Sequence, residues 1–145
     1  MLNSSLKAAA LILLSVASVN PALAQVDIGA GYQYGGALGA KYSLVQGEHT
    51  VYASLGLIGA AMGYQFVFSN NNKHAIGIAV GSEVITSEKG FAAFTYNYYS
   101  QGVSASGWVL GGSVGARRED KASMFASLDE VHTKTLVGIH VGYRF

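Results

Sequence analysis

From residue 26 onward, apolar and polar side chains alternate with a period of two, in long runs separated by clusters of turn-forming residues. This period is that of β-strands whose two faces meet different surroundings. The pattern predicts eight strands, most of them nine to twelve residues long, which is longer than is usual in soluble proteins. They cover residues 26–34, 37–46, 50–58, 61–69, 74–83, 91–99, 107–117 and 134–145.

The two faces of these strands differ in an unusual way. One face is large and apolar, as at Ile76 and Ile78, and the other is small or polar, as at Gly77 and Ala79. Charged residues fall on the small face, which would make a poor hydrophobic core. The difficulty disappears if the apolar face meets lipid and the small face lines a lumen, in a closed barrel without unpaired edges in hydrocarbon. We therefore expect an all-β fold, an eight-stranded antiparallel up-and-down transmembrane β-barrel.

Aromatic residues follow the same alternation. Three of them, Tyr52, Phe91 and Tyr99, fall on the inner face, where they can fill space beside inward-facing glycines. The others fall on the apolar face, several at strand ends, where aromatic girdles lie in membrane barrels. This outer set is Tyr32, Tyr42, Tyr64, Phe66, Phe68, Phe94, Tyr96, Tyr98, Trp108, Tyr143 and Phe145.

The lengths of the connections predict an orientation. An even number of strands puts both termini at one end of the barrel, which we take as periplasmic. The turns at that end are expected at 47–49, 70–73 and 100–106, and those at the other end at 35–36, 59–60, 83–90 and 118–133. The two longest connections fall at the outer end, as is typical of outer-membrane barrels.

The first 24 residues have the features of a secretory signal peptide. Lys7 is the only charged residue before Asp27, and it precedes an apolar run at 8–19 that is too short to span a bilayer as a helix. The run ends in a small-residue cleavage pattern at 22–24, which places the mature N-terminus at Gln25. We expect two segments, a signal peptide at 1–24 and an outer-membrane β-barrel at 25–145.

The composition and the short motifs mainly argue against particular binding partners and sites. The chain is 50% hydrophobic and 12% charged, has no cysteine, and without its leader carries eight basic and eight acidic residues. This balance gives no indication of a nucleic-acid partner. The glycine-rich stretches lie inside strand patterns with no helix after them, which argues against a phosphate-binding loop. The histidines share no spacing that gives one ligand face, so we expect no metal and no cofactor.

Polar and charged residues on the inner face predict a hydrogen-bonded network inside the barrel. Eight strands enclose a space just wide enough for side chains to fill. Barrel closure brings the first strand beside the last, so we expect Asp27 to pair with Arg144, with Lys41 and His140 as competing partners. The alternative interpretation is a narrow polar path, which would make the protein a small-solute channel. The expected network comprises Asp27, Lys41, Gln65, Asn97, His140 and Arg144, with Gln33, Ser54, Thr95 and Ser113 as further inner polar groups.

The last long connection combines charged and apolar residues. Met124, Phe125 and Leu128 recur at helical spacing and could cap the barrel mouth or contact an external partner. The same region holds the residues that a lipid-modifying enzyme could use at the outer level: Ser127, His132 and either Asp129 or Asp120. Nucleophilic catalysis requires a rigidly held base, which a mobile loop does not supply, so we expect no catalytic activity.

The C-terminal sequence Val-Gly-Tyr-Arg-Phe at 141–145 resembles the last strand of bacterial outer-membrane proteins, with Phe145 as terminal aromatic and Tyr143 two residues before it. The layout of the whole mature chain resembles that of small eight-stranded barrels of the OmpA transmembrane-domain or OmpX kind. The resemblance implies location in the cell outer membrane and contact with its lipid. It also implies recognition of Tyr143 and Phe145 by the barrel-assembly machinery. The expected role is structural or surface interaction; the external partner is unknown.

Overall fold

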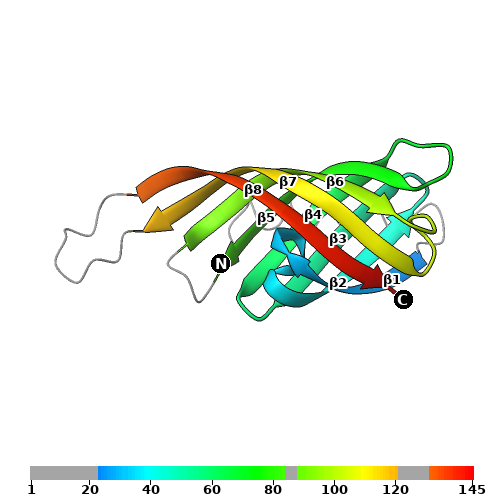
Figure 1. Ribbon diagram of the computed structural model, residues 1–145, viewed down its shortest axis with the longest axis horizontal. Helices are drawn as coiled ribbons and strands as arrows, with labels where there is room; N and C mark the ends of the chain where they lie inside the picture. The colour runs from blue at the N-terminus through cyan, green and yellow to red at the C-terminus, as the bar shows by residue number, and fades with distance from the viewer. Residues whose placement is uncertain (1–22, 84–87, 121–130) are drawn as a thin grey trace, which may run out of the picture.

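The computed structural model describes residues 23–83, 88–120 and 131–145, and these form a closed barrel of eight antiparallel strands (Figure 1). Each strand pairs with the next, and β8 pairs with β1, which confirms the predicted fold class. Among these residues no helix has the length and apolarity needed to cross a membrane. The elements are β1 (Leu23–Gly31), the 3-10 turn η2 (Tyr32–Tyr34), β2 (Gly36–Gln46), β3 (His49–Gly56), β4 (Gly59–Val67), β5 (His74–Glu83), β6 (Glu88–Tyr99), β7 (Gly107–Asp120) and β8 (Val131–Arg144).

The strand register determines the slope of the strands. Asp27 faces Arg144 across the seam between β1 and β8. On its other side Asp27 pairs with a residue of β2, which pairs with a residue of β3, and so on around the barrel. This row of paired residues reaches β8 at Lys134. These two positions on β8 are ten residues apart. For eight strands, such an offset corresponds to a tilt of about 40° from the barrel axis.

The two ends of the barrel differ. We call the end that holds Phe145 the base and the opposite end the rim. At the rim β7 and β8 extend beyond β1–β4 (Figure 1). Strands β6, β7 and β8 extend further toward the rim than predicted, and the loops between the strands are therefore shorter than predicted. The rim connections from β5 to β6 and from β7 to β8 span 84–87 and 121–130, and the base connection 100–106 is longer than the former. Only one of the two long connections predicted at the outer end is therefore long.

Side chains alternate between the inside and the outside of the wall as the sequence pattern predicts. Asp27 and Arg144 point inward and are 0% exposed, whereas Phe94 and Ile139 point outward and are 71% and 87% exposed. The inner aromatics Tyr52, Phe91 and Tyr99 are buried, as expected. The outer surface is thus covered by large apolar side chains, and the interior holds the polar ones.

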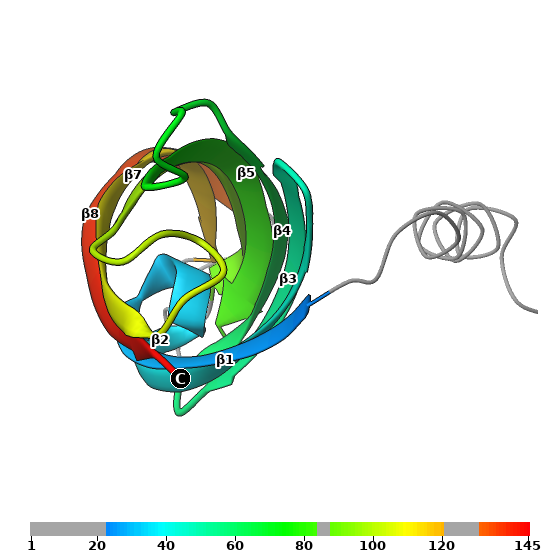
Figure 2. The same cartoon turned by 90° about the vertical axis from the view of Figure 1, so that its right-hand side faces the viewer.

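The prediction for the end of the first strand is wrong. β1 ends at Gly31, where φ is 116°, and the chain turns into the barrel interior as η2 before it leaves through Gly35 at φ 74°. Tyr32, expected on the apolar outer face, packs inside the wall edge-to-face against Phe91, with ring centroids 5.3 Å apart. Glycine tolerates positive φ, and so allows an inward turn that strand periodicity does not reveal. Figure 2 shows this blue segment inside the ring of strands.

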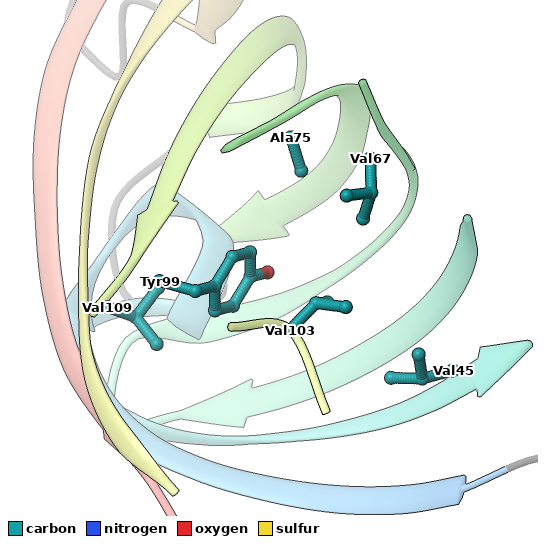
Figure 3. Close-up of a cluster of buried hydrophobic side chains, with 6 residues drawn as sticks. All are labelled: Val45, Val67, Ala75, Tyr99, Val103 and Val109. Atoms are coloured by element: carbon teal, nitrogen blue, oxygen red, sulfur yellow. The ribbon is translucent and has the colours of Figure 1, made fainter. Parts of the chain in front are cut away.

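The base of the barrel is closed by apolar side chains. The connection at 100–106 folds across the opening (Figure 2) and buries Val103, whose N–H donates to the Asn72 carbonyl at 2.8 Å. Val103 belongs to a cluster contributed by five strands and this connection (Figure 3), and each of its members is at most 3% exposed. The cluster comprises Val45, Val67, Ala75, Tyr99, Val103 and Val109.

Candidate functional site

A group of three buried charges lies inside the barrel at the seam. The Arg144 guanidinium donates from Nε to Asp27 Oδ1 at 2.6 Å and from Nη2 to Asp27 Oδ2 at 3.0 Å. This bidentate geometry confirms the predicted pairing of Asp27 with Arg144. Lys41 does not compete with Arg144 but joins it, because its Nζ lies 2.9 Å from Asp27 Oδ2. One carboxylate thus holds two cations, and the three side chains are 0% exposed.

Neighbouring groups complete the surroundings of the two cations. Arg144 also donates from Nη1 to the Val103 carbonyl and from Nη2 to Ser43 Oγ at 3.3 Å, and its Cζ lies 4.7 Å from the centroid of the Tyr99 ring. Lys41 Nζ lies 4.8 Å from the ring centroid of Tyr34 and 5.1 Å from that of Tyr52. Aromatic faces attract cations most strongly where water is excluded. The guanidinium therefore links the seam, through Asp27, to the connection that closes the base.

A layer of amide side chains lies beside the charges. Tyr99 donates from its hydroxyl to Gln65 Oε1 at 2.5 Å, and Gln65 Nε2 donates to Gln33 Oε1 at 2.9 Å. Gln33 Nε2 then donates to Asn97 Oδ1 at 3.1 Å. His140 Nε2 lies 2.8 Å from the same Asn97 oxygen, an arrangement that requires the proton on Nε2. This chain of hydrogen bonds joins β4, β6 and β8 to the inward turn η2, with Gln33 at its centre.

An apolar cluster lies on the rim side of the amide layer. Tyr32 from η2 packs on it, and Arg117 Nη1 donates to the Tyr32 hydroxyl at 3.2 Å. Its buried members are Tyr52, Ala61, Ala79, Phe91, Ala93 and Leu136. The interior is therefore built in layers: apolar at the base, then charged, then amide, then apolar again.

The structure separates the six predicted network residues into two groups. Asp27, Lys41 and Arg144 form the charged group, and Gln65, Asn97 and His140 belong to the amide layer. His140 is hydrogen-bonded to Asn97 in the amide layer, rather than to Asp27. Sequence reasoning placed Gln33 inside but missed its central position, and it missed Ser43, Tyr34 and the Val103 carbonyl.

A repeated triplet in the sequence was a signal for the missed residues. An aromatic–polar–aromatic pattern occurs at 32–34, 64–66, 94–96, 96–98 and 143–145. Its middle residue is buried in all five cases, and these residues are Gln33, Gln65, Thr95, Asn97 and Arg144. Three of the five are amides joined by hydrogen bonds through Gln33, so the pattern marks the interior network directly.

The outer aromatic residues gather toward the base. Tyr143 packs edge-to-face on Trp108 and on Phe145, with ring centroids 5.6 Å and 5.1 Å apart. The same contact occurs between β3 and β4 and again between β5 and β6, where a tyrosine hydroxyl lies beside the Nδ1 atom of a histidine. The distance is 2.5 Å from Tyr64 to His49 and 2.7 Å from Tyr96 to His74. We call this belt the aromatic girdle.

Several predicted residues fall outside the part of the chain that the structure describes. The expected surface contact of Met124, Phe125 and Leu128 lies there, as do Ser127 and Asp129 of the alternative catalytic set. The side chains of Asp120 and His132 are also outside the description.

Within residues 23–83, 88–120 and 131–145, no group of three or more histidine or acidic side chains is placed to hold a metal ion. Comparison of the chain with protein-family models, curated proteins and solved structures gives no match. The functional interpretation therefore depends on the geometry of the barrel.

The amide layer leads to a prediction for Gln33. Gln33→Leu should lower the free energy of unfolding by about 1–3 kcal/mol, because it leaves buried polar groups of Gln65 and Asn97 without this partner. Gln25→Leu is the matched control, since the Gln25 amide makes an exposed hydrogen bond to the Ser104 carbonyl at 3.2 Å, and it should change stability by less than about 0.5 kcal/mol. Urea unfolding of the refolded protein measures both. Equal losses for the two variants would show that η2 is not held by its amide.

Proposed function

We propose that this protein is a small barrel of the bacterial outer membrane with a structural or surface-interaction role and no catalytic activity. One observation carries the proposal, namely the inverted polarity of the barrel. Asp27, Lys41 and Arg144 are buried inside it, while more than twenty large apolar side chains are exposed on the outside. In water this arrangement would be unfavourable, whereas a lipid environment favours it because apolar side chains then meet hydrocarbon.

The order of residues along the outer surface supports this proposal. On β8 the outward side chains run from Tyr143 in the aromatic girdle, through Val141, Ile139 and Val137, to the polar Thr135 near the rim. An aromatic belt next to an apolar band is the outward pattern of membrane barrels. We place the base toward the periplasm and the rim toward the cell exterior.

Export and assembly are part of the same proposal. Residues 1–24 would act as a cleavable signal peptide, although β1 begins at Leu23, two residues before the proposed mature start at Gln25. Tyr143 and Phe145 would serve as the signal for the barrel-assembly machinery. Both rings lie on the outer surface, where a recognition factor could reach them before the barrel closes.

The layered interior argues against the alternative of a solute channel. The charged group and the amide layer are fully buried, and the apolar cluster around Val103 closes the base below them. A conducting path would have to break Asp27–Arg144 contacts as well as displace the 100–106 connection. Such a rearrangement would leave buried charges unpaired, which is costly.

The membrane proposal leads to a prediction for two positions on β5. Ile78 lies in the middle of the apolar surface, in one register row with Tyr64 and Phe94, and Ser82 is also outward but close to the rim. Ile78→Arg should lower stability in phospholipid vesicles by about 2–4 kcal/mol, and Ser82→Arg by about 0–1 kcal/mol, because the cost of a cation depends on depth. Denaturant unfolding in vesicles measures both. Equal small effects would contradict burial of this surface in lipid.

The layered interior leads to a prediction about conductance. The mature chain, folded in detergent and reconstituted in planar bilayers, should give no steady current steps, since the side chains of the charged group and of the amide layer are buried. Flotation of parallel vesicle samples would verify that the protein is inserted. Reproducible steps from inserted protein would instead favour the small-solute channel.

A further inference from the structure

The ladder between β1 and β8 stops where the chain turns into the barrel. β1 pairs with β8 through residues 27–30 and 141–144, and the next hydrogen-bonded position in the same register would bring Tyr32 opposite Ile139. Tyr32 is instead the first residue of η2, and its ring lies inside the wall, against the inner face at Gly138. Among the residues that the structure describes, β1 therefore offers Ile139 no ladder partner.

The backbone of Ile139 faces the side on which this partner is missing. The Phe145 N–H donates to the Val26 carbonyl at 2.9 Å, and in an antiparallel ladder the residues that exchange both backbone bonds recur at every second position. Ile139 belongs to this series, so its N–H and C=O point toward the β1 side. Its side chain is 87% exposed within the apolar outer surface. In the proposed membrane, backbone groups at such a position cost free energy unless they are hydrogen-bonded.

The segment that forms η2 also has the sequence of a hairpin turn. Residues 33–35 would form a three-residue loop between Tyr32 and Gly36, and such loops combine a type I turn with a following residue in the left-handed region. Gly35 already has φ 74° and ψ 29°, which lie in that region. Strand periodicity likewise predicts a strand at 26–34 with Tyr32 on the outer face. The local sequence therefore favours a longer β1, whereas contacts inside the barrel favour η2.

The contacts on the two sides of this balance are similar in kind. Inside the barrel, Gln33 accepts a hydrogen bond from Gln65 at 2.9 Å and donates one to Asn97 at 3.1 Å, and Tyr32 packs on the rim-side apolar cluster. With Tyr32 on the outside, its N–H and C=O would form two bonds with Ile139, and its ring would join the apolar surface. Hydrogen bonds of either kind contribute similar net free energies, so neither position of the segment dominates by its hydrogen bonds alone.

We propose that η2 is a conformational switch, in which residues 31–35 exchange between the inward turn and an outward hairpin that extends β1 and pairs Tyr32 with Ile139. The inference rests on the proposed membrane location, which makes the unpaired backbone of β8 unfavourable, and it goes beyond the structural role proposed above. In the outward state Tyr32 and Tyr34 leave the interior, and the rim-side apolar cluster and the amide layer become open toward the rim. The cluster at the base stays in place, so the switch uncovers the upper interior without opening a path through the barrel.

Two neighbouring positions on β8 distinguish the two states, because they lie on opposite faces of the wall. The chain has no cysteine, so introduced pairs report without background. Tyr32→Cys with Gly138→Cys should form a disulfide in the inward state, since a Cβ at Gly138 would lie 2.8 Å from the Tyr32 ring. Tyr32→Cys with Ile139→Cys should form one only in the outward state, because side chains that point apart cannot be bridged. In vesicles with a membrane-permeable oxidant we expect both disulfides, the first at the higher rate.

Gln33→Leu tests whether the amide contacts set the balance. It removes the hydrogen bonds that hold the inward state, so it should raise the initial rate of the 32–139 disulfide about tenfold, whereas Gln25→Leu should leave that rate unchanged. If the 32–138 disulfide forms and the 32–139 disulfide does not, even with Gln33→Leu, the segment has one inward state and the proposal is wrong. Formation of the 32–139 disulfide alone would contradict it equally.

Two further measurements keep the test decisive. Ile28→Cys with Tyr143→Cys is the control for the chemistry, since these outer residues already face each other across the seam, and the proposal fails if this pair bonds while neither pair with residue 32 does. If Tyr32→Cys does not fold, amide hydrogen exchange replaces it. Gln33→Leu should then slow exchange of the Ile139 amide but not of the Leu136 amide, which faces β7, and an unchanged Ile139 amide would overturn the switch. The Ile78→Arg measurement tests the membrane proposal separately.

Discussion

The carboxylate of Asp27 is the centre on which the rest of the interior depends. It lies on β1, the strand that closes the barrel, and it holds a guanidinium from β8 and an ammonium from β2. The seam has only four paired residues on each strand, so side-chain contacts across it carry more weight than elsewhere in the wall. Arg144 extends the linkage to the Val103 carbonyl, and Val103 belongs to the cluster that closes the base.

The side chains that fill this interior support the proposal of a structural barrel over that of a solute channel. The inward turn η2 fills the space that the inner glycines leave, and Gln33 connects it to β4 through Gln65 and to β6 through Asn97. Charged groups in a dry interior bind each other strongly but are costly to separate. Under the proposed membrane location, function is expected at the surfaces that remain: the apolar band and the aromatic girdle, which would face lipid, and the tall rim, which would face the exterior.

Much of the fold could be predicted from the sequence because strand periodicity dictates which side chains share a face. The period of two gave the eight strands and the inward position of Asp27 and Arg144, and closure of the barrel then predicted their pairing. The inward turn at Tyr32 was not predictable in this way, since it depends on positive φ at Gly31 and Gly35. The binding of Asp27 by Lys41 and Arg144 together was also missed. Alternation predicts which face of the wall a residue lies on, but it does not predict the strand register that determines its neighbours.

The most direct test of the account is a double-mutant cycle on Asp27 and Arg144, measured by equilibrium unfolding in phospholipid vesicles. Asp27→Asn leaves two buried cations without their anion and should cost about 3–5 kcal/mol. Arg144→Met leaves the neutral pair of Asp27 and Lys41 and should cost less. The account predicts that Asp27→Asn loses clearly less stability when Arg144 is already methionine, with a coupling energy above about 1 kcal/mol. Strictly additive losses would contradict the claim that this carboxylate closes the barrel.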